Sequence, residues 1–184
     1  MEYRHQPVML AEVLEMLNPQ PGEYFLDATL GGGGYTLSLA ERVAEKGKVL
    51  GVDMDPLAIE NIREIMEKEG IKNIETAHSN FSRIKQVSEE RLGEGVRFQG
   101  IVFDLGLSSA QLEDENRGFS FQKDTPLDMS FGGEDQKGEK SSAGYIVNSY
   151  SFQELSRIFK ELGEEKLSPR IAKKIGRASC RERV

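Results

Sequence analysis

Four consecutive glycines, Gly31 to Gly34, stand between an apolar run that ends at Asp27 and a helix-like run that begins near Tyr35. Glycine lacks a Cβ atom, so a ligand can approach its backbone closely, and it reaches positive φ angles without strain. Asp53 follows roughly twenty residues later, the separation at which an acidic side chain reaches the hydroxyls of a bound ribose in nucleotide-binding α/β folds. The pattern predicts a ligand that carries a ribose, in preference to a tight turn followed by a simple helix cap.

The arrangement of the glycines separates two classes of ribose-bearing ligand. Dinucleotide-binding folds use G-x-G-x-x-G, which places a pyrophosphate at a helix N-terminus. Here the glycines are contiguous, and Asp27 precedes them where a cationic ligand would lie. This favours S-adenosylmethionine, whose sulfonium is positive, over NAD. Asp27 serves equally well as the hydrogen-bond anchor of the turn, because Asp is common in turns, and the sequence leaves both roles open.

Strand-like and helix-like segments alternate around these residues. Apolar runs predict four strands, at residues 24–28, 48–53, 73–78 and 98–106. Helical periodicity predicts a helix before the first strand and one after each of the first three, the last from Phe81 to Leu92. Asp55 can cap one of these helices, with Pro56 in its first position. The fourth strand is a nearly continuous apolar run, typical of a parallel sheet covered on both faces. The alternation predicts an α/β fold with a doubly wound parallel sheet and right-handed crossovers.

The pattern changes after Gly106. Residues 107–140 show no sustained period, yet they retain several large apolar side chains, which favours a functional loop over a linker. Ser151 and Glu154 form a capping box ahead of an amphipathic helix, and a further basic helix is expected after Pro169. Two helices are therefore expected after the loop.

Composition narrows the class of protein. The chain has 184 residues, a net charge of -7 and a single cysteine, Cys180, which excludes an intramolecular disulfide and a thiolate-rich metal site. No apolar run is long enough to cross a bilayer, and the N-terminus lacks the order of a signal peptide, so we expect a cytoplasmic protein. The negative net charge of the chain argues against nucleic-acid binding in general. The local electrostatic field at a cleft, however, determines whether a nucleic acid can bind there.

Five stretches carry a resemblance to a known family: "DATLGGGGYT", "GVDMDP", "SNFS", "FDLGLSSAQLEDENRGFSFQKDTPLDM" and "LGEEKLSPRIAKKI". Over His5 to about Lys174 the chain resembles the bacterial 16S rRNA cytosine-N4 methyltransferase family (RsmH, also called MraW). The resemblance implies a Rossmann-like class I S-adenosylmethionine-dependent methyltransferase sheet with the start of an inserted helical domain. The implied reaction is methylation of the exocyclic amine of a cytosine in the decoding centre of 16S rRNA, with the small ribosomal subunit as partner and no metal.

The resemblance also implies roles for individual residues. The implied cofactor contacts are Gly33, Gly34, Tyr35, Asp53, Phe81, Asp104 and Gln111. Tyr35 stands where the family usually has His. Asp53 would accept from the ribose hydroxyls, and Phe81 either packs on the adenine face or belongs to the core. Asp104 would bind the cofactor or act as the catalytic acceptor of a hydrogen from the target amine, and the sequence does not separate these roles.

The long loop pairs positive charge with aromatic surface. Its candidates for RNA contact are Arg117, Phe119, Phe121 and Lys123. Single-stranded RNA is bound by rings that stack on bases and cations that neutralise phosphates. For the two phenylalanines, a hydrophobic staple that holds the loop to the core is an equal alternative, because Phe is commonly buried.

The chain differs from the family in length, because family members are considerably longer. We therefore expect an incomplete sheet, in which the fourth strand presents an apolar edge without its neighbour. We expect an S-adenosylmethionine-binding part at residues 1–106, a substrate and cofactor loop at 107–140, the start of the inserted helical domain at 141–174 and a non-native tail at 175–184. Two alternatives to an active methyltransferase stay open: a fragment that binds the cofactor without turnover, and an NAD-dependent oxidoreductase. The sequence does not indicate an oligomeric state.

Overall fold

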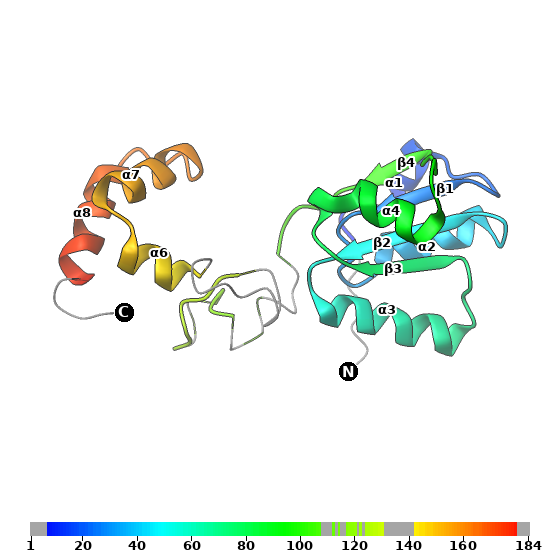
Figure 1. The fold of residues 1–184 in the computed structure, drawn as a ribbon, viewed down its shortest axis with the longest axis horizontal. Coiled ribbons are helices and arrows are strands. Elements are labelled where there is room, and N and C mark those ends of the chain that lie inside the picture. Colours follow the sequence, from blue (N-terminus) through cyan, green and yellow to red (C-terminus); the bar gives the residue numbers. More distant parts are fainter. Residues whose placement is uncertain are drawn as a thin grey trace. The chain divides into compact units, whose positions relative to one another are not determined.

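The computed structural model describes residues 7–107, 112, 114, 117–120, 122, 124–130 and 142–179. The chain divides into two compact units, residues 1–109 and 110–184, and each is considered by itself. The first unit holds the predicted α/β fold and the second holds helices (Figure 1).

A parallel sheet of four strands forms the centre of the first unit. The strands are β1 (Tyr24–Asp27), β2 (Lys48–Asp53), β3 (Ile74–His78) and β4 (Gly100–Val102). Their order across the sheet is β3-β2-β1-β4, and every adjacent pair is parallel. This order is the first part of the doubly wound arrangement, so the prediction of an α/β fold with a parallel sheet is confirmed.

Helices cover both faces of this sheet. The helices of the first unit are α1 (Leu10–Leu17), α2 (Gly34–Val43), α3 (Pro56–Glu69) and α4 (Ile84–Leu92). Side chains alternate along a strand, so neighbouring residues belong to different cores. Phe25 and Val49 pack with residues of α1 and α2, whereas Leu26 and Leu50 pack with Val87 of α4. The two clusters hold the strand ends in fixed register.

The start of α3 agrees with the sequence pattern, and the segment after β3 does not. Asp55 accepts a hydrogen bond from the backbone N–H of Leu57 and Pro56 is the first residue of α3, as predicted. The helix expected from Phe81 to Leu92 is divided into a short 3-10 helix, η1 (Phe81–Arg83), and α4. Asn80 caps η1 by accepting from Ser82, which turns the chain before α4 begins.

The fourth strand is shorter and more exposed than its apolar composition predicts. It pairs only with β1, along Gly100, Ile101 and Val102, because it is the edge strand of the described sheet. Val102 is buried, but Ile101 is 45% exposed and Phe103 is 46% exposed. The expectation of a strand reaching residue 106 was therefore wrong, whereas the expected apolar edge is confirmed, and Asp104 lies in the segment that follows the strand.

The second unit contains three described helices, α6 (Ala143–Ser149), α7 (Phe152–Glu161) and α8 (Ser168–Ser179). Ser151 and Glu154 make the predicted capping box: the Ser151 hydroxyl accepts from the N–H of Glu154, and the Glu154 carboxylate accepts from the N–H of Ser151. The Ser151 hydroxyl also donates to the Glu154 carboxylate at 2.7 Å, and this bond, together with the one from the Ser151 N–H, lowers the pKa of Glu154. Leu155 and Ala172 are buried where α7 packs against α8.

Candidate cofactor site at the carboxyl edge of the sheet

The carboxyl ends of parallel strands meet at one edge of the sheet, which is where ligands bind in open α/β folds. In this chain that edge gathers the glycine turn after β1, Asp53 at the end of β2, the segment that leads from β3 to Phe81, and Asp104 after β4. The structure thus brings together four of the regions that the sequence singled out.

Asp53 is joined to the glycine turn. One carboxylate oxygen, Oδ2, accepts from the backbone N–H of Gly31 at 2.8 Å, and the other, Oδ1, accepts from the N–H of Asp55 at 2.9 Å. Each oxygen of an ionised carboxylate has two lone pairs, so both retain capacity for a further donor. The arrangement is compatible with ribose hydroxyls that donate to an already oriented carboxylate.

The glycines are required for different reasons along the turn. Gly31 and Gly33 have positive φ angles, 48° and 81°. A Cβ atom at Gly33 would lie 2.5 Å from Cδ1 of Ile62 in α3, so the end of that side chain would have to move, and the φ of 81° favours glycine as well. A Cβ at Gly31 would make only an ordinary 3.7 Å contact with the carbonyl oxygen of Thr29. The approach of a ligand is therefore compatible with Gly31, while helix packing explains Gly33.

Asp27 is the anchor of the turn, which was one of its two predicted roles. Its side chain is 0% exposed. Oδ1 accepts from the N–H of Thr29 at 3.1 Å, and Oδ2 accepts from the hydroxyl of Thr36, in the first turn of α2, at 2.8 Å. Burial raises the pKa of Asp27 to about 6, although these hydrogen bonds oppose the rise and the charge of Asp53 adds to it. The carboxyl group has no exposed surface with which to touch a ligand.

Thr29 is a site residue that the sequence analysis missed. Its hydroxyl accepts from the backbone N–H of Asp104 at 2.8 Å, which links the turn after β1 to the segment after β4. The neighbouring Ala28 donates to the carbonyl of Val102 at 2.9 Å. Asp104, the candidate catalytic group, is thus held at its backbone while its side chain is exposed. Thr29 lies within the motif "DATLGGGG", but nothing local indicates a partner so distant in sequence.

Phe81 makes an aromatic contact that the sequence did not suggest. Its ring lies 5.8 Å from that of Phe103, centroid to centroid, at an interplanar angle of 85°. Both side chains are partly open to solvent, at 42% and 46% exposure. Phe81 is therefore not an ordinary core residue, which was the alternative to a role at the adenine.

Tyr35 is buried in the core at the first turn of α2. Its hydroxyl donates to the carbonyl oxygen of Val8, in the segment before α1. Burial raises the pKa of Tyr35, and the negative charges of Asp104 and Asp27 add to the effect. The side chain thus ties the N-terminal segment to α2, so a cofactor contact at this position would come from the backbone.

The structure describes only two of the candidate residues in the long loop, Arg117 and Phe119. Gln111, Phe121 and Lys123 lie outside the described residues. Nε of Arg117 forms an ion pair with Asp114 at 3.0 Å, and only 11% of the Arg117 side chain is exposed. Phe119 is half-buried. The positive charge of Arg117 is therefore already neutralised within the loop, which limits what it can offer to a phosphate.

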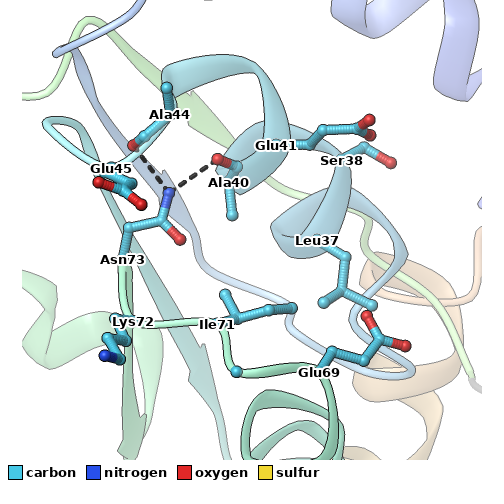
Figure 2. A pocket seen from close by; sticks show the side chains of 11 residues that line it. Leu37, Ser38, Ala40, Glu41, Ala44, Glu45, Glu69, Ile71, Lys72 and Asn73 are labelled. Carbon is cyan, nitrogen blue, oxygen red and sulfur yellow. Dashed lines mark hydrogen bonds between the residues drawn. The ribbon is translucent and has the colours of Figure 1, made fainter.

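A hollow elsewhere on the first unit lies away from these residues. It is lined by the last turns of α2 and by the segment between α3 and β3, at the amino edge of the sheet (Figure 2). Asn73 there donates from Nδ2 to the carbonyls of Ala40 and Ala44, at 2.7 and 2.9 Å, and so caps the C-terminal end of α2. We place the cofactor at the carboxyl edge, because the hollow has none of the glycine turn, Asp53 or Asp104.

Two further classes of site find no support in the part of the chain that the structure describes. No group of three or more His, Cys, Asp or Glu side chains there is arranged to hold a metal ion. Among the same residues, none of the helices combines the length and apolar character that crossing a bilayer requires.

Comparison with known proteins identifies relatives over nearly all of the chain. The ribosomal RNA small subunit methyltransferase H of Clostridium botulinum (strain Loch Maree / Type A3) is 42% identical over 173 residues, which are 94% of this chain and 53% of that protein. The protein of the same name from Halothermothrix orenii is 40% identical over 168 residues, 91% of this chain and 51% of its own length. The chain spans about half the length of these curated relatives.

Solved structures give a shorter overlap. A SAM-dependent methyltransferase from Aquifex aeolicus is 32% identical and matches 39% of this chain and 38% of its own, with a TM-score of 0.36. The family model of the MraW methylases, in contrast, matches residues 2–184. That match confirms the resemblance drawn from the sequence motifs, and this chain belongs to the MraW methylase family.

Proposed function

We propose that this chain binds S-adenosylmethionine at the carboxyl edge of its sheet and forms part of an rRNA methyltransferase. The observation that carries the proposal is the junction of Asp53 with the glycine turn, where the carboxylate accepts from the Gly31 N–H and retains further acceptor capacity. Membership of the MraW methylase family and the curated relatives named rRNA methyltransferases support the same reaction class.

The finer proposal is methylation of the N4 amine of a cytosine in the decoding centre of 16S rRNA. The bound cofactor would supply an electrophilic methyl group. The lone pair of a cytosine amine is delocalised into the ring, so the protein must hold the amine in attack geometry. It must also accept a proton from the amine as the N–C bond forms, the S–C bond breaks and S-adenosylhomocysteine leaves. Asp104 is our candidate for that acceptor, because its backbone is held by Thr29 while its carboxylate is exposed at the same edge as Asp53.

The remaining regions receive roles on the same proposal. Residues 1–106 would bind the cofactor, 107–140 would cover cofactor and substrate, and 141–174 would begin an inserted helical domain. Gly33, Gly34, Tyr35, Phe81 and Gln111 would complete the cofactor contacts, and the loop with Phe119, Phe121 and Lys123 would meet the rRNA. The small ribosomal subunit in the bacterial cytoplasm would be the partner.

Isothermal titration with S-adenosylmethionine and with NAD tests the cofactor. We expect binding of S-adenosylmethionine, no binding of NAD, and a loss of about tenfold or more in affinity in Asp53→Asn, which removes charged acceptors from the ribose hydroxyls. Glu75→Gln is the matched control, because Glu75 pairs with Lys48 at 3.6 Å away from the carboxyl edge. Binding of NAD alone would favour an oxidoreductase and contradict the proposal.

Turnover requires a separate assay. Small ribosomal subunits that lack the modification are incubated with labelled S-adenosylmethionine, and the nucleosides are separated to identify N4-methylcytidine. Since the chain spans about half of its relatives, the second candidate is a cofactor-binding fragment without turnover. Binding with no label in the rRNA would favour that candidate, and label in another nucleoside would contradict the N4 assignment.

A further inference from the structure

An exposed pair of aromatic rings crosses the carboxyl edge of the sheet. Phe81 follows β3 and Phe103 follows β4, which are the two outer strands of the described sheet. The rings nevertheless meet edge to face, with centroids 5.8 Å apart and planes at 85°. Phe is among the residues most often fully buried, yet these two keep 42% and 46% of their surface open. Together they leave an aromatic surface free for another group.

Hydrogen bonds hold Phe81 beside the proposed ribose-binding acid. The N–H of Ser79 donates to the carbonyl of Asp53 at 2.8 Å. Asn80, which precedes Phe81, accepts from Ser82 at 2.8 Å and points its Nδ2 at the sulfur of Met54, 3.1 Å away. The segment that carries Phe81 is thereby fixed against the end of β2.

Phe103, after the opposite outer strand β4, is held by hydrogen bonds of its two neighbours in the chain. The residue before it, Val102, accepts from the N–H of Ala28 at 2.9 Å, and the residue after it, Asp104, donates to the hydroxyl of Thr29 at 2.8 Å. Phe103 thus lies between two backbone anchors that attach it to the turn after β1. The position of the ring pair is therefore set by hydrogen bonds to the end of β2, on the Phe81 side, and to the turn after β1, on the Phe103 side.

We propose that Phe103 and Phe81 together form the surface on which the adenine packs, an inference that rests on the proposed cofactor site. Phe103 is then a cofactor contact in addition to Phe81. Adenine is bonded to the ribose, so a ribose held by Asp53 places the base within one nucleoside of that carboxylate. Phe81 follows a segment that is hydrogen-bonded to Asp53 through the Ser79 N–H, and Phe103 contacts the ring of Phe81. An edge-to-face partner fixes the plane of Phe81, and aromatic surfaces favour offset or edge contacts with a planar base.

The absence of tryptophan from the chain gives a direct test. Phe103→Trp introduces a single tryptophan at the proposed contact, and its emission should change on titration with S-adenosylhomocysteine or adenosine but not with homocysteine, which has no base. Met16→Trp is the matched control, because Met16 is 87% exposed on α1. If the Phe81–Phe103 contact only joins the segments after β3 and β4, the emission of the Phe103→Trp variant will not change with either nucleoside, and the proposal is contradicted.

Affinity gives the second readout. We expect Phe103→Ala to weaken binding of S-adenosylhomocysteine by about two- to tenfold, the range that corresponds to one aromatic contact, and Phe103→Tyr to restore it. Binding by calorimetry with no change in the emission of the Phe103→Trp variant would overturn the adenine assignment alone. A folded wild-type chain that binds neither S-adenosylmethionine nor S-adenosylhomocysteine would overturn the proposed function, and the assignment with it.

Discussion

Asp27→Asn isolates the effect of burying an ionised group in the turn. Asp27 is fully buried, and burial raises its pKa from 3.8 to about 6. A carboxyl group whose pKa is raised on folding binds more protons in the folded than in the unfolded chain, so the free energy of unfolding falls as pH rises between these two values. One pKa unit corresponds to about 1.4 kcal/mol, so the cost at neutral pH is about 3 kcal/mol.

The variant should lose this dependence, because Asn is not ionised. Its amide oxygen can still accept from Thr29, and its Nδ2 can donate to the Thr36 hydroxyl, so the turn keeps two of its hydrogen bonds. We expect the free energy of unfolding of Asp27→Asn, relative to wild type, to rise by about 2 kcal/mol from about pH 4.5 to pH 8. Urea denaturation followed by circular dichroism at several pH values measures this difference.

Glu41→Gln is the control for the loss of one carboxylate, since Glu41 is exposed on α2. Its stability curve should run nearly parallel to that of wild type. If the curves of Asp27→Asn and wild type also run parallel, then burial does not destabilise the ionised Asp27 carboxylate. The reasoning that burial raises its pKa is then refuted. A dependence of the opposite sign would show instead that the ionised carboxylate stabilises the turn.

Three further variants test other parts of the structure. Thr29→Val removes the acceptor for the N–H of Asp104, so cofactor affinity in calorimetry should fall about fivefold and Thr29→Ser should restore it; equal affinities would contradict the linkage. Gly33→Ala should lower the free energy of unfolding by about 2 kcal/mol or more, against about 1 kcal/mol for Gly70→Ala, because both have positive φ but only Gly33 has a neighbour in the way. Ser151→Ala should cost about 1 kcal/mol and reduce hydrogen-exchange protection in the first turn of α7, and unchanged protection would contradict the capping box.

The frame of the first unit was predictable because its signals are local. The four strands fall within the predicted segments, and the caps at Asp55 and Ser151 depend on partners a few residues away. Errors occurred where the tertiary position of an element matters. The fourth strand pairs with β1 only from Gly100 to Val102, and the apolar run that continues beyond it does not show where the pairing ends.

The candidate site was predictable only in part. The glycine turn and Asp53 were found from their spacing, and the structure joins them through the Gly31 N–H. Thr29 and Phe103 were missed, because their partners lie far away in the chain; Thr29 and Asp104 are 75 residues apart. An aromatic residue directly before a candidate acid, as Phe103 is before Asp104, is the sequence signal that could have indicated it.

The sequence by itself determined the family, the alternation of strands and helices, and the places where the backbone must be glycine or must be capped. These follow from residue types within a few positions of one another, and from motifs that the chain shares with its relatives. Only the tertiary structure decided that Asp27 is a buried anchor, that Gly33 makes room for Ile62, and that Phe81 meets Phe103. The physical reason is that strand order and parallel register set which distant side chains share a space, and no local pattern encodes that choice.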